Sequence, residues 1–318
     1  MKRHFFNLTL VRPASVLAGG LLVLSAGLAY YTHWHNARTL AQATSKAAEI
    51  AMNGVAEALR RYQYGLRGAR GAIIMLEKQS DKRAGFHDYS LTRDITTEFP
   101  GARGFGYIHR VAQADTPAFV AAASADGKPD FAVKQLKPHD GDRYIIQYIE
   151  PAGINMDAIG LDIASEPGRR MAADAAMQSG TVQLTAPITL VQATGYPAQS
   201  FLMLLPVYRG YVMPSDAAAR AAALVGWTYA PLMTRDILDA ARLGGGTGII
   251  TLYDVTSGFP GVQFFRTNQA GEAVAAGAMA ERTVYGRRWQ LRFEPLPVFV
   301  TALRFWNPWL VLALGSGL

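Results

Sequence analysis

The sequence predicts an α+β fold in which a long N-terminal helix precedes mainly antiparallel sheets, with an apolar segment at each end. Three observations support this prediction. Residues 36–80 keep a helical periodicity without a proline. Residues 81–297 break into short strand-like runs separated by turn residues, with one Ala-rich helix among them, which indicates sheets that do not follow strict βαβ alternation. Residues 13–31 and 298–318 are strongly apolar.

The composition narrows the class of protein. The chain has 318 residues, of which 50% are hydrophobic and 17% charged, enough for two modest domains. The formal net charge is +7, but no block of basic residues alternates with aromatics, so we expect no nucleic-acid partner. The absence of cysteine excludes disulfides and thiolate metal sites, and it is compatible with an oxidising compartment. The 6 histidines are scattered, and we expect neither a metal nor a cofactor.

The N-terminal segment has the pattern of a membrane helix. MKRHFFNLTLVR is basic, and residues 13–31 follow without a charge. A helix of that length, at ~1.5 Å per residue, crosses a hydrocarbon core of about 30 Å. The basic flank predicts that residues 1–12 are cytoplasmic and residues 13–33 transmembrane. A cleaved signal peptide is the alternative, because small residues near Ala26 offer cleavage sites, but the helical pattern continues directly onward. Aromatic residues suited to the far interface are Tyr30, Tyr31 and Trp34.

The C-terminal segment PVFVTALRFWNPWLVLALGSGL is apolar as well, with Trp306 and Trp309 as interface anchors. Too few residues follow Trp309 to cross a bilayer. We therefore expect residues 298–318 to be the start of a second transmembrane helix that continues in a longer protein. This topology places residues 35–297 in the periplasm, outside a bacterial inner membrane.

Residues 34–80 are predicted to form a helical stalk. Apolar residues recur at alternating spacings of four and three, the pattern of a coiled-coil seam or of a helix packed on a domain. The seam could pair with its copy in a homodimer or lie against the domain that follows, and the pattern alone does not choose. The seam residues are Ala48, Met52, Val55, Leu59, Tyr62, Leu66, Ala69, Ile73 and Leu76.

The remaining chain divides near Met233. The first predicted domain, residues 81–232, has strands at 104–111, 131–134, 144–149, 182–191, 201–208 and 225–230. The second, residues 233–297, begins with a short helix that ends near Leu243, followed by strands at 249–254 and 262–266 and the alternating run RRWQLRFEP.

Two short segments resemble ligand-binding loops but lack the arrangement that such loops require, and no catalytic motif is present. GGGTG at residues 244–248 follows a helix and precedes a strand, the reverse of a phosphate-binding loop. DGDR at residues 140–143 lacks the ligand spacing of a calcium loop, so we expect a hairpin turn. The sequence has no cysteine nucleophile and no Gly-x-Ser-x-Gly motif. A periplasmic hydrolase would need a nucleophile paired with a base, and no such pair is identifiable. We expect no catalytic residue in this region.

The segment GLDIASEPGRRMAADAA raises a specific question. Ser165 is positioned to cap a helix whose first turn carries Arg169 and Arg170, although cations at a helix N-terminus are disfavoured by ~0.3–1 kcal/mol. Asp174 lies four residues after Arg170 and can pair with it. Arg169 needs another anion, which is either a local carboxylate or a ligand. The local carboxylates are Asp162 and Glu166.

The order of several motifs resembles the CHASE domain, the extracytoplasmic sensor of many bacterial and plant receptors. These motifs are RYQYGLRGARG, FPGARGFGYIHRV, YIEPAGINMDAIGLDIASEPGRR, SGTVQLTAPITLV, LLPVYRG and LVGWTYAP. The resemblance covers residues 55–232 well and extends weakly to residue 297. It implies a long helix followed by two PAS-like α/β domains, of which the membrane-distal one, residues 81–232, binds the ligand. It also implies a homodimer and a cytoplasmic output domain, such as a histidine kinase or a nucleotide cyclase.

The same resemblance implies a set of ligand-binding residues, aligned on the plant cytokinin receptors. An aspartate that binds the adenine ring in those receptors corresponds here to Arg169. Arginine only donates hydrogen bonds and favours carboxylate or phosphate, so a small anionic ligand is expected instead of a purine. The helix N-terminus would face the same anion. The full candidate set is Tyr148, Arg169, Thr185, Val191, Leu204, Trp227 and Tyr229.

One alternative belongs to a different class. The chain could be a membrane-anchored periplasmic protein that binds another protein and has no small-molecule ligand. In that case the distal pocket would be filled with side chains, and Arg169 would point outward, paired with Asp162 or Glu166.

Overall fold

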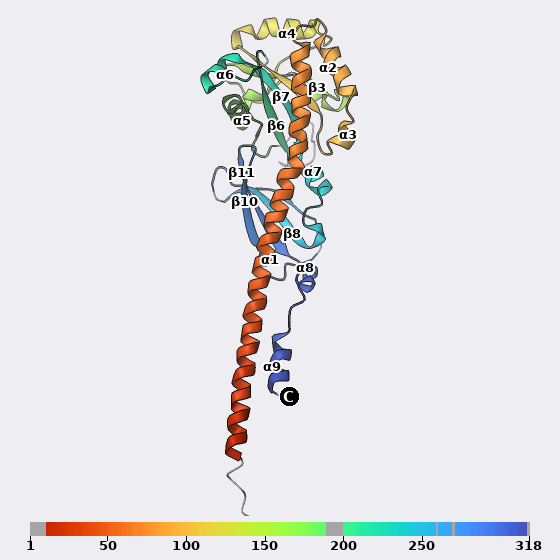
Figure 1. The fold of residues 1–318 in the computed structure, drawn as a ribbon. Helices are drawn as coiled ribbons and strands as arrows, with labels where there is room; N and C mark the ends of the chain where they lie inside the picture. Colours follow the sequence, from red (N-terminus) through yellow and green to blue (C-terminus); the bar gives the residue numbers. More distant parts are fainter. Residues whose placement is uncertain (1–10, 189–199, 211, 259, 269–270, 317–318) are drawn as a thin grey trace, which may run out of the picture.

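A computed structural model describes residues 11–188, 200–210, 212–258, 260–268 and 271–316 of the chain. The molecule is elongated, with helix α1 (Val11–Leu76) running along its whole length and two sheets stacked one above the other beside it (Figure 1). The predicted cytoplasmic residues 1–12 lie largely outside the described part.

Helix α1 is one continuous helix of 66 residues, about 100 Å long at ~1.5 Å per residue. It joins the predicted membrane segment to the predicted stalk without a break, because no proline or turn signal separates them. Among the described residues, α1 is the only helix long and apolar enough to cross a membrane, and its apolar window is mostly unburied.

The first sheet has seven strands in the order β2-β4-β3-β1-β7-β6-β5. Its pairs are antiparallel except for β2 with β4. The strands are β1 (Phe105–Val111), β2 (Lys134–Gln135), β3 (Arg143–Glu150), β4 (Leu161–Asp162), β5 (Gln183–Leu184), β6 (Ser200–Tyr208) and β7 (Leu224–Met233).

Two predicted strands are shorter than expected. The strand expected at residues 131–134 is reduced to β2, and the strand expected at 182–191 is reduced to β5 plus an isolated bridge between Ile188 and Ser200. Residues 189–191 of that prediction lie outside the described residues. The predicted hairpin at residues 140–143 is wrong, because β4 lies between β2 and β3, and the segment is a connection between strands that do not pair.

The second sheet has four antiparallel strands in the order β10-β11-β8-β9. They are β8 (Gly248–Asp254), β9 (Val262–Arg266), β10 (Ala278–Val284) and β11 (Arg287–Pro295). The predicted division at residues 232/233 falls between the two sheets at the end of β7, and the division into domains stays a prediction. Helix α7 (Thr234–Ala240) and a 3₁₀ turn (Leu243–Gly246) precede β8, so the glycine-rich segment follows a helix and precedes a strand, as predicted.

The short helices cover the sheets and connect the strands. Four of them, α2, α3, α4 and α6, lie where the sequence pattern suggested strands and turns. Asp81 caps α2 by accepting a bond from the Ala84 amide, and Pro117 begins the Ala-rich α4. The short helices are α2 (Lys82–Leu91), α3 (Ile95–Glu98), α4 (Thr116–Ala125), α5 (Pro167–Ser179), α6 (Ala217–Ala223), α8 (Pro297–Ala302) and α9 (Pro308–Ser316).

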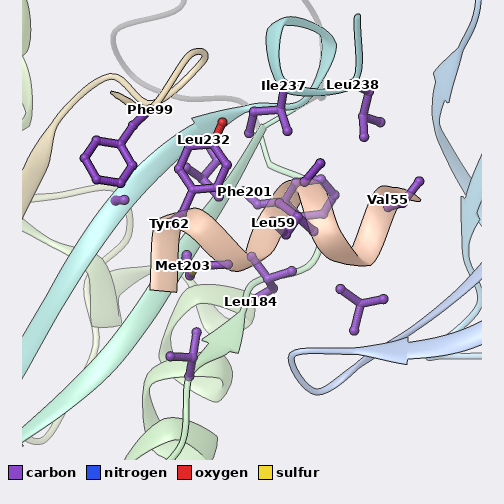
Figure 2. Close-up of a cluster of buried hydrophobic side chains, with 14 of the residues drawn as sticks. Val55, Leu59, Tyr62, Phe99, Leu184, Phe201, Met203, Leu232, Ile237 and Leu238 are labelled. Carbon is purple, nitrogen blue, oxygen red and sulfur yellow. The ribbon is translucent and has the colours of Figure 1, made fainter. Parts of the chain in front are cut away.

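The apolar seam of α1 packs on the chain's own sheets. All nine predicted seam residues, from Ala48 to Leu76, are buried and belong to one core cluster that includes residues of both sheets. Figure 2 shows Val55, Leu59 and Tyr62 of α1 among side chains of the first sheet and of α7. The two sheets are also linked directly, because the Leu184 amide donates a 2.9 Å hydrogen bond to the Tyr285 carbonyl.

The opposite face of the first sheet packs against α5 and forms a second core. The Trp227 indole Nε1 donates a 2.9 Å hydrogen bond to the Ala173 carbonyl of α5. The next residue, Thr228, points the other way, and its hydroxyl donates a 3.1 Å bond to the Leu66 carbonyl of α1. The alternation of side chains along β7 therefore places neighbouring residues in two different layers.

The two apolar ends of the described chain lie side by side. Helix α9 runs beside the N-terminal part of α1 (Figure 1). Gly315 lies so close to Ser25 that a Cβ added at this glycine would come within 2.3 Å of the serine hydroxyl oxygen. The close approach of α9 to α1 at this point therefore requires glycine at position 315.

Candidate ligand-binding site

The N-terminus of α5 is capped by Glu166. Its carboxylate accepts 2.9 Å hydrogen bonds from the amides of Gly168 and Arg169. The predicted cap, Ser165, is wrong: its hydroxyl donates to the Asp162 carbonyl and accepts from the Leu136 amide at 2.9 Å. Ser165 ends a preceding 3₁₀ turn, and the Glu166 side chain at the N-cap position accepts from two amides of the first helical turn. Pro167 opens the helix and Gly180, at φ 71°, ends it.

Arg170 faces outward and is paired locally. Its Nε lies 4.0 Å from Asp174 Oδ2, the partner predicted from the sequence. Its guanidinium also lies over the Tyr144 ring, 5.5 Å from the centroid. Tyr144 in turn donates a 2.6 Å hydrogen bond to Asp174 Oδ1. Arg170 therefore has a structural role on the outside of α5.

Arg169 points inward, with only 5% of its surface exposed. Its Nε lies 3.9 Å from Glu166 Oε2, so one of the two predicted local carboxylates is a neighbour. Asp162, the other, accepts hydrogen bonds from the amides of Tyr144 and Ala164 instead. Burial lowers the pKa of Arg169, and the negative charge of Glu166 opposes that shift.

Tyr229 lies next to Arg169 in the same layer. Its side chain is completely buried, and its hydroxyl has no hydrogen-bond partner among the residues that the structure describes. Burial raises the pKa of Tyr229 well above its ordinary value, and the positive charge of Arg169 opposes the rise. A buried cation thus lies beside a buried hydroxyl that can donate a hydrogen bond, which is a suitable pair for an anion.

Other predicted residues surround this pair. Leu204 and Trp227 are fully buried in the same core cluster as Tyr229. Thr185 is also buried, but its hydroxyl accepts a 3.0 Å hydrogen bond from the Leu202 amide. This bond connects the residue after β5 to β6, so the hydroxyl has a structural role at the edge of the sheet. Val191 lies outside the described residues. The structure therefore brings Arg169, Leu204, Trp227 and Tyr229 into one layer, with Thr185 at its side.

Tyr148 is not part of this layer, because it faces α1 on the opposite side of the sheet. The register between β1 and β3 shifts at this point: Tyr107 pairs with Tyr148, and Ile108 pairs with Ile146. The extra residue, Gln147, changes the phase of the alternation. The Tyr148 hydroxyl donates a 2.6 Å hydrogen bond to Asp126 Oδ2.

A polar network around Tyr148 was missed in the sequence. Gln147 Nε2 donates a 2.8 Å bond to the Tyr148 hydroxyl, and Gln147 Oε1 lies 3.2 Å from His109 Nδ1. The alternation of GFGYIHRV carries one usable signal, because it places Tyr107 and His109 on the same face of β1. No sequence signal indicates the bulge at Gln147. Among the described residues, no group of three or more His, Asp or Glu side chains is arranged to hold a metal.

The family described as "CHASE domain" matches residues 79–265, more than half of the chain. No curated protein matches the chain. Among solved structures, the chain is similar to an extracellular ligand binding receptor from Desulfohalobium retbaense DSM5692, with 11% identity and a TM-score of 0.44. That alignment covers 77% of this chain and 39% of the receptor, so the chain spans well under half of its length.

Proposed function

Because the chain belongs to the CHASE domain family, we propose that it is the periplasmic ligand-sensing region of a transmembrane signalling receptor in a bacterial inner membrane. Residues 35–297 are periplasmic and form two PAS-like domains, of which the distal one, residues 81–232, binds a small anionic ligand. The receptor is a homodimer, and its output domain is a cytoplasmic histidine kinase or cyclic-di-GMP enzyme. CHASE domains sense and do not catalyse, so no reaction is assigned to this region.

One observation carries the site assignment: Arg169 and Tyr229 are both buried and close enough to interact electrostatically, and the Tyr229 hydroxyl lacks a hydrogen-bond partner among the described residues. A buried polar group without a partner costs about 1–3 kcal/mol, so such groups in native proteins need an explanation. An anionic ligand supplies one, since a carboxylate or phosphate accepts hydrogen bonds from both a guanidinium and a phenol. Leu204 and Trp227 would contact the apolar part of the ligand.

Transmission would use the contacts on both sides of β7. Trp227 ties the sheet to α5, and Thr228 ties it to α1. A ligand that moves α5 relative to the sheet would therefore alter the support of α1, which continues toward the membrane. Such a ligand shifts the equilibrium only by its difference in affinity for the two arrangements.

The partner-binding alternative predicts a different position for Arg169. In that alternative the distal pocket is filled with side chains and Arg169 points outward. The complete burial of Leu204, Trp227 and Tyr229 fits the alternative. The Arg169 side chain is only 5% exposed, which favours the ligand-binding proposal. The 3.9 Å approach to Glu166 favours the alternative, because a local carboxylate then supplies part of the required negative charge. The distance of 3.9 Å is long for an ion pair, and the Glu166 carboxylate already accepts two hydrogen bonds as the cap of α5. Glu166 therefore supplies only part of the negative charge that Arg169 needs.

The test is a thermal-shift screen of the full chain in detergent with a panel of small carboxylates and phosphates. We expect at least one anion to raise the denaturation temperature. Arg169→Gln should remove this shift, Arg169→Lys should retain part of it, and Arg170→Gln, next to it on the outside of α5, should leave it unchanged. If the Arg169→Gln variant is still stabilised fully by the anion, the anchor is wrong. If no anion stabilises the wild-type chain, the partner-binding alternative is favoured.

A further inference from the structure

The face of the first sheet opposite α5 contains a cavity of about 260 Å³. It lies between the sheet and the last turns of α1, and none of the residues around Arg169 borders it. Its volume is close to the lower end of the range for small-molecule sites, ~300–1,000 Å³. The cavity is separate from the proposed anion site because the sheet itself lies between them.

Part of the cavity wall is apolar and aromatic. Tyr107 and Tyr148 lie side by side with their ring centroids 6.2 Å apart and their planes inclined by 24°. Aliphatic side chains of α1 and of the sheet complete this wall, including Ile73, Ile74 and Val225. A ligand that fills the cavity therefore needs a compact apolar body, and an aromatic ring can stack on the tyrosines.

A hydrogen-bond chain fixes the protonation of His109 in this wall. Tyr148 donates to Asp126, so it accepts from the Gln147 amide nitrogen at 2.8 Å. The side-chain oxygen of Gln147, Oε1, must then accept a hydrogen bond from His109 Nδ1, which lies 3.2 Å away. Burial lowers the pKa of His109, so the ring is neutral at pH 7 and its Nε2 is an acceptor. In the described part of the chain, Nε2 has no hydrogen-bond partner.

Charges of both signs border the same cavity. Glu77, at the end of α1, contributes a carboxylate, and Lys82 and Arg209 contribute cations. None of these three forms an ion pair with another described residue. Glu77 acts on Tyr107 electrostatically and Lys82 acts on His109, so each charge lies near the aromatic wall. The lining thus offers acceptors for an ammonium group and donors for a carboxylate.

We propose that this cavity is a second ligand site, specific for a small zwitterion with an apolar body, such as an aromatic α-amino acid. The ligand ammonium binds Glu77 and His109 Nε2, the ligand carboxylate binds Lys82 and Arg209, and the side chain lies on Tyr107 and Tyr148. Because Ile73, Ile74 and Glu77 belong to α1, a ligand here contacts the helix that continues toward the membrane.

The test uses isothermal titration of the full chain in detergent with three probes. L-phenylalanine carries both charges, 3-phenylpropionate lacks the ammonium, and phenethylamine lacks the carboxylate. We expect L-phenylalanine to bind about tenfold or more tightly than either analogue, since each analogue loses a charge-assisted hydrogen bond. Glu77→Gln should weaken L-phenylalanine binding about tenfold and leave 3-phenylpropionate binding unchanged. Lys82→Gln should weaken the binding of both.

Two control variants locate the site. Glu57→Gln changes an exposed carboxylate on the same helix, 3.3 Å from Arg60 and away from the cavity, and should leave all three affinities unchanged. Arg169→Gln should also leave them unchanged, because Arg169 lies on the other side of the sheet. The proposal is overturned if L-phenylalanine does not bind, if either analogue binds equally well, if Glu77→Gln has no effect, or if Arg169→Gln abolishes binding.

Discussion

Asn36 in α1 donates a hydrogen bond of 2.7 Å from its side-chain nitrogen to the main-chain carbonyl of Trp306, 270 residues further along the chain. On α1 the bond lies N-terminal to the buried seam that begins at Ala48, and at the other end it lies just before α9 begins at Pro308. It holds the two apolar segments next to each other, an arrangement that suits two helices entering one bilayer from the same side.

Cysteine labelling tests this topology. Because the chain contains no cysteine, a single one can be introduced at any position without background. Ser215 is exposed on the first sheet's side of the molecule, so Ser215→Cys should react with a membrane-impermeant maleimide in intact spheroplasts. Lys2→Cys should react only after the membrane is permeabilised, because the basic flank stays in the cytoplasm. Labelling of both positions in intact spheroplasts would contradict the proposed membrane orientation.

The buried seam of α1 should dominate its contribution to stability. Leu66 is completely buried, so Leu66→Ala should lower the free energy of unfolding by about 2–5 kcal/mol. Ile50 on the same helix is 61% exposed, and Ile50→Ala should change it by no more than about 0.5 kcal/mol. Urea denaturation of the detergent-solubilised chain measures both. Equal effects would mean that the seam does not pack on the sheets.

Tyr229→Phe should stabilise the protein without ligand. It removes a buried hydroxyl that has no partner among the described residues, so the free energy of unfolding should rise by about 1 kcal/mol. The same change should weaken binding of an anion at Arg169. Tyr144→Phe is the matched control, because that hydroxyl donates to Asp174 at 2.6 Å and its loss should destabilise by about 1 kcal/mol. A destabilised Tyr229→Phe variant would show that this hydroxyl has a partner.

Stability should fall in mild acid because of His109. Burial lowers its pKa below the ordinary 6.5; the bond to Gln147 opposes the shift and the charge of Lys82 adds to it. The unfolded chain therefore binds a proton at higher pH than the folded chain. This contribution is fully present above about pH 6.5 and is lost as the pH falls through the lower folded pKa. Denaturation at pH 7.5 and 5 should show a smaller pH effect for His109→Gln than for the wild type, and an equal pH effect in both would contradict this prediction.

Periodicity was the most informative property of the sequence. The spacing of apolar residues from Ala48 to Leu76 identified nine buried positions of α1, because an amphipathic helix buries its apolar stripe, although it did not include the buried Ala51 and Ala58. The partner of that face was not predictable, since a second copy and the chain's own sheets require the same pattern. The start and stop of α5 near Pro167 and Gly180 were equally clear, because the fixed φ of proline suits the first turn of a helix and glycine readily adopts the left-handed conformation that ends one.

The arrangement of the site depended on features that a linear pattern does not contain. One extra residue, Gln147, turned Tyr148 toward α1 and away from Arg169. The cap of α5 was assigned to Ser165 because serine is a common cap, although Glu166 is the residue that reaches two amides. Whether Arg169 or Arg170 pointed inward followed from the rotation of α5 on the sheet, which is set by contacts such as that of Trp227 with Ala173.

The continuity of α1 has a mechanical consequence. A rod of 66 residues has no joint at which a displacement could be absorbed, so its lower end must follow whatever the sheets do to its upper half. Small tilts between the rod and the sheets would be magnified over its length, whereas axial shifts would arrive undiminished. The position at which a ligand contacts α1 therefore decides which kind of movement reaches the N-terminal end of the helix.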